Sequence, residues 1–316
     1  MTAFLNITLG LIGIVLLYYG AEWLVNGGAA IARKMKVQPL VIGLTLVAFG
    51  TSAPELVVSV DAALTGHGDV CIGNVVGSNI CNIALILGLC ALISPIPVNA
   101  RLFKMDVPVL VFASITLVVF HALSAGITRW QGGLFFAGII VYTLQNLQAS
   151  RKEETAKENT APAETPRQIN VLFALFLFAG GLLTLVAGGK MLVKSAVYAA
   201  QLCQIPEAII GLTVVAVGTS LPELATSVVA ARKGENDIAV GNVVGSNIFN
   251  ILGILGIAPL LKPIHAPGIA MTDMAVMIFL TLILVPVMKT GFRISRREGL
   301  FLLGIYILYV IWLIKG

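Results

Sequence analysis

Residues 42–83 read IGLTLVAFGTSAPELVVSVDAALTGHGDVCIGNVVGSNICNI, and residues 210–251 repeat this text without a gap at a constant offset of 168. Of the 42 aligned positions, 28 are identical. A duplication of this length predicts that the chain is built from two equivalent halves. It also places a proline and a glutamate twice inside an apolar run, where both residues are unfavourable.

The composition is that of a membrane protein. Of the 316 residues, 58% are hydrophobic and 11% are charged, and the mean hydropathy is +0.98. A soluble domain has about a quarter of its residues charged. Several nearly uncharged stretches reach the roughly 20 residues that a membrane-spanning helix needs. No basic leader or cleavage site marks the N-terminus, so the first apolar run is expected to remain in the protein.

The apolar runs predict an all-α polytopic fold with ten transmembrane helices, five in each half. The first half (1–149) and the second half (169–316) are joined by a charged, Pro/Thr-rich linker (150–168), which is expected to be solvated. The expected spans are 7–31, 39–65, 70–94, 106–124, 130–149, 170–200, 206–231, 238–261, 271–289 and 298–315.

Basic residues predict the orientation of these helices. Fifteen of the twenty Lys and Arg residues fall in the linker or in the loops on its side of the membrane. By the positive-inside rule the linker is cytoplasmic and both termini are outside. Because each half has an odd number of spans, equivalent helices run in opposite directions. Inverted repeats of this kind are typical of secondary transporters, whose sites lie near the midplane between the repeats.

Four stripes of oxygen-bearing residues are expected to meet at that depth. In the second and seventh spans the spacing i, i+3, i+4, i+7 places four residues on one helix face. In the third and eighth spans the spacing is i, i+4, i+8. The four stripes are Ala48, Thr51, Ser52 and Glu55; Ala216, Thr219, Ser220 and Glu223; Asn74, Ser78 and Asn82; and Asn242, Ser246 and Asn250.

The stripes predict a site for a hard cation. Pro54 and Pro222 each remove a helix hydrogen bond, so carbonyls near Ala48 and Ala216 can turn toward the bundle. Carboxylate, hydroxyl and carbonyl oxygens suit Ca²⁺ or Na⁺ rather than zinc or copper. An unpaired charge at the bilayer centre costs about 3 kcal/mol on insertion scales, so an empty, ionised site is unfavourable. Obligatory exchange of cations is the expected consequence.

Other polar residues are given structural interpretations. Glu22 aligns with Lys190 and Asp61 aligns with Val229, so neither position belongs to a symmetric cation site. Asp69 and Asp237 are expected to start helices and stabilise the positive ends of their dipoles. The glycines of GNVVGSN also suit close helix packing. The cysteines and histidines lack metal-site spacing, and the cysteines are expected to be packing residues: Cys71, Cys81, Cys90, Cys203, His67, His121 and His265.

The two segments GTSAPELVVSV and GTSLPELATSV, with two copies of GNVVGSNI, resemble the α-repeats of the sodium/calcium exchanger family. The resemblance implies a ten-helix fold in which helices 2, 3, 7 and 8 form the ion sites and helices 1 and 6 slide across them. It implies exchange of several Na⁺ for one Ca²⁺. The implied ligands are Ala48, Thr51, Ser52, Glu55, Ser78, Asn82, Ala216, Thr219, Ser220, Glu223, Ser246 and Asn250.

Two departures from the family refine this expectation. Asn250 stands where the potassium-dependent branch typically has Asp, which favours a potassium-independent exchanger. The short linker leaves no room for the calcium-sensing domains of the animal exchangers. The GN..E pattern of proton-coupled exchangers is absent around Glu55 and Glu223, although protons can compete for these carboxylates.

The sequence therefore predicts a Na⁺/Ca²⁺ antiporter of prokaryotic type, multi-pass in the plasma (inner) membrane, with no catalytic residues and no cofactor. Its expected partners are Ca²⁺, Na⁺, competing H⁺ and membrane lipid; no nucleic acid is expected, and a monomer is plausible. The nearest alternative is a proton-coupled Ca²⁺/cation exchanger of the same fold. A cation channel and an intramembrane enzyme are less favoured, because the repeats suit alternating access and the stripes contain no histidine or lysine.

Overall fold

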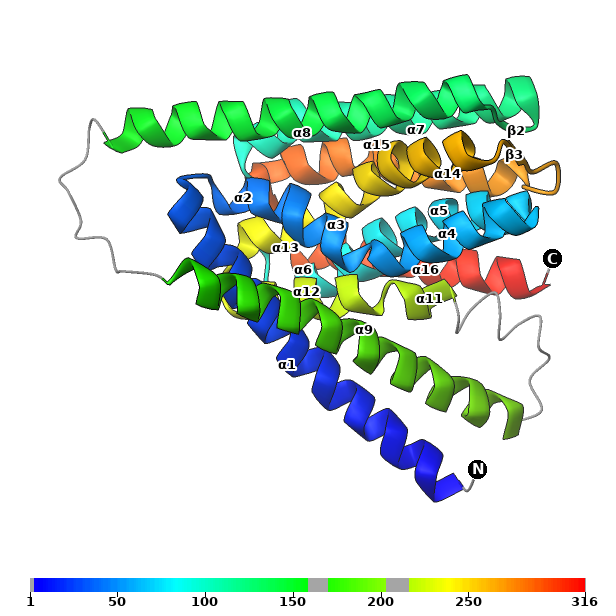
Figure 1. Cartoon of the computed structure of the whole chain (residues 1–316), viewed down its shortest axis with the longest axis horizontal. Coiled ribbons are helices and arrows are strands. Elements are labelled where there is room, and N and C mark those ends of the chain that lie inside the picture. Colours follow the sequence, from blue (N-terminus) through cyan, green and yellow to red (C-terminus); the bar gives the residue numbers. More distant parts are fainter. Residues whose placement is uncertain (1–2, 159–169, 203–215, 316) are drawn as a thin grey trace.

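A computed structural model of the chain describes residues 3–158, 170–202 and 216–315 (Figure 1). Nearly all of them are helical. Most elements labelled η are π-helical turns, and η6 is a 3₁₀ turn. The helices of the first half are α1 (Ala3–Met35), α2 (Pro39–Ile42), η1 (Gly43–Val47), α3 (Ala48–Thr51), α4 (Ala53–Thr65), α5 (Gly68–Ile80), η2 (Cys81–Leu87), α6 (Gly88–Ile93), η3 (Leu102–Asp106), α7 (Val107–Ser124) and α8 (Arg129–Glu158).

The second half repeats this order from residue 171 onward. Its π-helical turn η5 again interrupts the span that carries GNVVGSNI. The helices are α9 (Val171–Leu202), α11 (Ala216–Thr219), α12 (Leu221–Arg232), α13 (Asn236–Ile248), η5 (Phe249–Ile254), α14 (Leu255–Leu261), α15 (Met271–Lys289), η6 (Thr290–Phe292) and α16 (Arg296–Lys315).

Eight of the expected spans have the length and apolar composition to cross a membrane, if the bent pair α2–α4 counts as one. The expected fifth span forms α8. The seventh span was expected from residue 206; residues 206–215 lie outside the described residues, and the rest forms α11 and α12. The structure is thus a helical, multi-pass membrane protein, and the total of ten spans remains a prediction.

The expected linker differs from the structure at its start. We expected a solvated connection from residue 150, but α8 continues as a helix to Glu158. Ser150 is buried, and its Oγ accepts a hydrogen bond from the Gln38 backbone N–H at 2.7 Å. Arg101 also lies 3.7 Å from the carboxylate of Glu153. These contacts with the first half keep the helix ordered past the end of its apolar stretch.

Short strands join the loops at each end of the bundle, which the all-α expectation did not include. β1 (Ile96–Pro97) pairs antiparallel with β4 (Arg293–Ile294). β2 (Gly126–Ile127) pairs in the same way with β3 (Ile264–His265). β1 and β3 are related by the repeat offset, so the two pairings are symmetry mates that tie the halves together at opposite ends.

Figure 1 defines these two ends: α8 finishes and α9 begins at one, called here the linker end, and the chain termini lie at the other, called the terminus end. The spans α5–η2–α6 and α13–η5–α14 are the most buried of the described spans and occupy the centre of the bundle. The outer spans expose apolar side chains such as Phe112, Leu123 and Leu172. Such surfaces suit contact with lipid, because the backbone hydrogen bonds are satisfied within each helix.

α1 and α9 form a separate pair that lies across the rest of the bundle (Figure 1). Glycines allow their backbones to touch. A Cβ atom on Gly13 would lie 2.9 Å from the Gly188 carbonyl oxygen, and one on Gly20 would lie 2.9 Å from that of Gly181. Small residues at helix interfaces are a common means of close backbone packing in membranes.

Candidate cation site

The duplicated motif breaks its helix at the serine before the proline. Ser52 has φ −82° and ψ 8°, and Ser220 has φ −87° and ψ 8°. Pro54 and Pro222 fall in the first turn of the helix that follows, where the missing N–H has no acceptor to lose. The two parts of the second span are bent by 49°. The sequence predicted a helix opened by Pro54, and in the structure α3 and α4 are separate helices that meet at Ser52, so Ala48 and Glu55 do not lie along one straight helix.

The two glutamates are held by serines from the opposite halves. Ser52 Oγ donates to Glu223 Oε1 at 2.7 Å, and Ser220 Oγ donates to Glu55 Oε1 at 3.1 Å. Both carboxylates are 1% exposed. The crossed arrangement follows from the inverted repeat, because the broken helices of the two halves face each other. It brings both carboxylates to one place in the bundle.

Asparagines of α5 and α13 support these broken helices from the side. Asn242 donates to the Glu223 carbonyl oxygen at 3.4 Å and to Ser227 Oγ at 2.9 Å. Asn74 makes the matching bonds to the Glu55 carbonyl oxygen and to Ser59. In the first half, Thr51 Oγ1 also donates to Asn242 Oδ1 at 3.1 Å. Asn74 and Asn242 thus fix the turns that carry the glutamates.

A set of four asparagines links the third and eighth spans beside the glutamates. Asn82 Nδ2 donates to Asn247 Oδ1, and Asn250 Nδ2 donates to Asn79 Oδ1, both at 3.0 Å. Asn82 lies in η2 and Asn250 in η5, and π-helical turns are frequent at functional sites. Sequence reasoning missed Asn79 and Asn247, although each lies three residues before a predicted ligand and is identical in the repeat.

Five oxygen atoms around the glutamates are buried without a hydrogen-bond partner: Glu55 Oε2, Glu223 Oε2, Ser78 Oγ, Asn82 Oδ1 and Asn250 Oδ1. Buried acceptors are normally satisfied, and leaving one unpaired costs roughly 1–3 kcal/mol. Cations bound among them would provide partners for these oxygens. Two carboxylate oxygens with hydroxyl and amide oxygens form a donor set that suits Ca²⁺ and Na⁺.

The remaining predicted ligands lie around this cluster. Ser246 Oγ donates to the Ala48 carbonyl oxygen at 3.5 Å, and this carbonyl also accepts the Ser52 backbone N–H at 3.0 Å, so it remains bonded within its helix turn. Thr51 and Ser246 are fully buried, whereas Thr219 is half-buried. Ala216 begins α11 in the matching turn. The expected ligand set therefore lies on four broken or π-distorted spans, and its role in binding remains a prediction.

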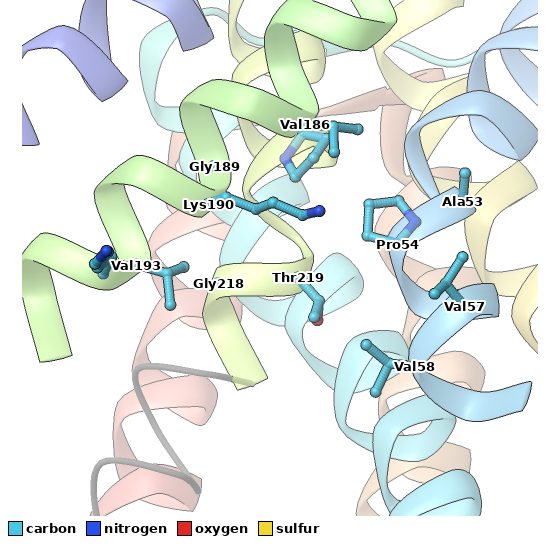
Figure 2. A pocket seen from close by; sticks show the side chains of 12 residues that line it. Ala53, Pro54, Val57, Val58, Val186, Gly189, Lys190, Val193, Gly218 and Thr219 are labelled. Carbon is cyan, nitrogen blue, oxygen red and sulfur yellow. The ribbon is translucent and has the colours of Figure 1, made fainter. Parts of the chain in front are cut away.

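A cavity of about 470 Å³ leads to this cluster from the terminus end. Asn74, Gly77 and Thr219 line its inner part, and Asp69 and Asp273 line its mouth. A second cavity, of about 450 Å³, separates α9 from α4 and shares Val58 and Thr219 with the first (Figure 2). Among its described lining residues, Lys190 points toward Pro54. Among the described residues, both cavities lie on the terminus side of the site.

The linker end of the same site is sealed by α2 and η1. A Cβ atom on Gly241 would lie 2.9 Å from the Leu40 carbonyl oxygen, and one on Gly245 would lie 2.4 Å from that of Leu44. Phe49 and Phe249 stack across the halves with their ring centroids 4.4 Å apart. This side of α13 is packed against backbone, which leaves no passage along it.

The other sequence interpretations can be compared with the structure. Asp69 and Asp237 do lie in the first turns of α5 and α13, as expected. Cys71, Cys81 and Cys90 are buried free thiols, consistent with packing; Cys203 lies outside the described residues. Within the part of the chain that the structure describes, no group of three His, Cys, Asp or Glu residues could hold a metal ion. A cation site here depends on neutral oxygens as well as on the two glutamates.

Comparison with known proteins agrees with this geometry. The family model described as "Sodium/calcium exchanger protein" matches the chain twice, over residues 5–147 and 173–315, which is once for each half. A putative antiporter, CaxA, of Alkalimonas amylolytica is 39% identical over 95% of this chain and 95% of its own length. The sodium/calcium exchanger MaX1 of Methanosarcina acetivorans is 35% identical over 97% of each chain.

A solved structure extends the likeness to three dimensions. The sodium-calcium exchanger NCX_Mj, soaked with zero Na⁺ and Ca²⁺, superimposes with a TM-score of 0.85. It is 34% identical in sequence, and the alignment covers 99% of this chain and 100% of that one. The two matches to the family model, the full-length relatives and the shared architecture show that this chain belongs to the sodium/calcium exchanger family, as a member of prokaryotic type.

Proposed function

We propose that this chain is a secondary antiporter that exchanges Na⁺ for Ca²⁺. The observation that supports this most directly is the group of five buried, unpartnered oxygens around Glu55 and Glu223. The ions would bind where α3–α4, α5–η2, α11–α12 and α13–η5 meet. The names of the relatives MaX1 and NCX_Mj indicate the same pair of ions.

The charges of the site explain why transport would be coupled. Glu55 and Glu223 together neutralise one Ca²⁺, and Na⁺ ions can replace it among the same oxygens. With neither ion bound, two buried negative charges would face each other in a low-dielectric interior, which is strongly unfavourable. The unloaded carrier would therefore change access slowly. Ca²⁺ would cross in one direction only when Na⁺ returns in the other.

The amides favour a site without a third charge. Asn82 and Asn250 contribute neutral oxygens where a carboxylate would add negative charge. A total of two negative charges suits a site that handles Ca²⁺ and Na⁺ without co-transport of K⁺. We therefore propose that exchange is independent of K⁺.

Alternating access fits the two ends of the site. The cavity lined by Asn74 and Thr219 opens it to the terminus end, while Leu40 and Leu44 seal the linker end. The excess of basic residues in the linker-end loops favours a cytoplasmic linker, by the positive-inside rule. We infer that the protein lies in the plasma (inner) membrane and that this conformation is open to the outside.

The decisive measurement is Ca²⁺ uptake into proteoliposomes that contain the purified chain. An outward Na⁺ gradient should drive uptake, whereas K⁺ or H⁺ gradients of the same size should not. Glu55→Gln and Glu223→Gln should each lower the Na⁺-driven rate at least about 100-fold, because a bound divalent cation would lose one of its two neutralising carboxylates, and an uncompensated buried charge costs roughly 3–5 kcal/mol.

Glu298→Gln is a matched control, since this carboxylate bonds Ser295 far from the site and its loss should leave the rate near that of the unaltered chain. Uptake that follows the H⁺ gradient and ignores Na⁺ would identify a proton-coupled exchanger instead. Uptake that survives both glutamate substitutions would place the ions elsewhere in the protein.

A further inference from the structure

At the linker end, an ion pair ties the α1–α9 pair to the core. Lys233, which follows α12, lies 2.8 Å from the Glu22 carboxylate and donates to Asn26 Oδ1 at 3.0 Å. Glu22 and Asn26 are one turn apart on α1, so both hold the same ammonium group. The contact lies beside the sealed side of the site, and α1 packs closely on α12 there. It stabilises closure at that end.

The repeat offset identifies the counterpart of this contact at the terminus end. Glu22 corresponds to Lys190, Asn26 to Lys194 and Lys233 to Thr65. The offset also relates Gly13 to Gly181 and Gly20 to Gly188, so it holds along the whole α1–α9 pair. By symmetry, Lys190 and Lys194 should face the outer part of α4 as Glu22 and Asn26 face the end of α12.

Among the described residues, the counterpart contact is not formed in this conformation. Lys190 and Lys194 line the cavity of about 450 Å³ between α9 and α4, together with Pro54 and Val57 (Figure 2). Asp61 follows Val57 by one turn on the same face of α4, and it lies one turn before Thr65. All three charged side chains are exposed, and none makes an ion pair or side-chain hydrogen bond within the described part of the chain.

We propose that Lys190 and Lys194 hold the Asp61 carboxylate when the site opens to the linker end, as Glu22 and Asn26 hold Lys233 now. The inference rests on the proposed alternating access. Because glycine contacts join α1 to α9, one movement of the pair would separate Glu22 from Lys233, close the α9–α4 cavity and bring the lysines to Asp61. These residues are positioning residues for exchange, since they select which end is open and touch no transported ion.

The sign of each charge supports the pairing. Lysine side chains without partners are unfavourable near the interior of a membrane, and their symmetry mates on α1 carry no positive charge. In both the observed and the proposed contact, two side chains one turn apart on α1 or α9 hold one charged side chain on, or just after, α12 or α4. The position of Asp61, one turn closer to the midplane than Thr65, suits two long lysine side chains.

Cross-linking tests this in the full-length chain reconstituted in liposomes, after its four natural cysteines are replaced. Asp61→Cys with Lys194→Cys should be linked by a short bifunctional thiol reagent. A third substitution, Gly77→Cys, reports access, because Gly77 lines the cavity and a Cβ atom there meets no described atom within 4 Å. Linking positions 61 and 194 should slow labelling of the Gly77→Cys thiol by an impermeant reagent at least tenfold. Linking Glu22→Cys to Lys233→Cys should leave labelling as fast as before.

Charge exchange provides an independent measurement. Asp61→Asn and Lys194→Gln should each lower the exchange rate about two- to fivefold, as expected for a partly exposed ion pair. Asp61→Lys combined with Lys194→Asp should recover at least half of the original rate. Lys104→Gln, an exposed lysine on η3, serves as the neutral control.

The outcomes separate this inference from the proposed function. Absence of Na⁺-driven exchange in the unaltered chain would overturn the proposed function, whatever the labelling shows. Exchange that persists while positions 61 and 194 never link, or while linking them leaves labelling unchanged, would overturn the pairing alone. Failure of the charge-exchanged variant to recover, with normal folding, would do the same.

Discussion

α5 and α13 contain the same eight residues, GNVVGSNI, yet they lie in different surroundings. Gly73 and Gly77 of α5 border the cavity that reaches the site, whereas Gly241 and Gly245 of α13 are packed against the backbone of α2 and η1. Asn74 is half-buried, and its mate Asn242 is fully buried. Among the described residues, the two copies of the same sequence therefore have different neighbours. The counterparts of Leu40 and Leu44 in the second half, residues 208 and 212, lie outside the described residues.

The largest expected difference between α5 and α13 is in how each helix tolerates substitution of its glycines. Gly245→Ala would place a Cβ atom 2.4 Å from the Leu44 carbonyl oxygen, so the helices must move apart. Overpacking of this kind costs about 1–3 kcal/mol. The matched substitution Gly77→Ala meets no described atom within 4 Å, and from these contacts it should change the free energy of unfolding by less than about 0.5 kcal/mol.

Thermal unfolding of the purified variants, in the absence of transported ions, measures both effects. A large loss of thermal stability for Gly245→Ala, with no loss for Gly77→Ala, would confirm that α5 and α13 differ in packing. Equal losses would show that the open and sealed ends exchange so readily that neither dominates. Equal tolerance would contradict the close contact between α13 and η1.

The asparagine set tests a feature that the two halves share. Asn79 and Asn247 accept the amide N–H groups of Asn250 and Asn82, which turns the Oδ1 atoms of those residues away from hydrogen bonds and leaves them free for a cation. Asn79→Leu and Asn247→Leu should each lower Ca²⁺ affinity about fivefold, which corresponds to the roughly 1 kcal/mol of one hydrogen bond.

Equilibrium Ca²⁺ binding to the detergent-solubilised protein measures the change. Asn79→Asp retains the acceptor for Asn250 and provides the conservative comparison. If the Leu variants bind Ca²⁺ as tightly as the unaltered chain, the amide oxygens of Asn82 and Asn250 are not ligands. A loss in one half only would show that the ions occupy the site asymmetrically.

Much of the site could be predicted because the motif that carries its polar residues occurs twice in the sequence. The break near Ser52 follows from the absence of an N–H group on Pro54. The opposition of Glu55 and Glu223 was expected from two matching halves that each have an odd number of predicted spans. These features depend on local backbone chemistry and on chain topology, and both can be read from the order of residues.

Other features depend on packing between distant segments. η2 and η5 are π-helical although neither contains a proline, so their sequences carry no signal that predicts a π-helical turn. The crossed hydrogen bonds of Asn79 and Asn247 form only once these turns have formed. The length of α8 depends on contacts of Ser150 and Glu153 with Gln38 and Arg101. Which described segments cover each copy of GNVVGSNI could not be predicted, because the two copies have the same sequence.

The smallest expected effect concerns the carboxylates at the mouth of the open cavity. Asp69 and Asp273 line it, and Tyr309 Oη donates to Asp273 at 2.9 Å. Negative charge at a cavity entrance raises the local concentration of cations, and salt screens this effect over about 10 Å at 0.1 M. Asp273→Asn keeps an acceptor for Tyr309 and removes only the charge. It should raise the KM for external Ca²⁺ about two- to threefold at low ionic strength, with no change in maximal rate.

The dependence on salt separates attraction from structure. The difference between Asp273→Asn and the unaltered chain should disappear when the ionic strength is raised with a non-transported salt such as choline chloride. A difference that persists at high salt would mean that Asp273 acts through its contact with Tyr309, and Tyr309→Phe should then reproduce it. At the sealed end, Asp237 corresponds to Asp69 but lies where α13 packs against Gly43, so Asp237→Asn should leave the KM for external Ca²⁺ unchanged. A cation that approaches from the terminus end is therefore attracted by Asp69 and not by its repeat counterpart, Asp237.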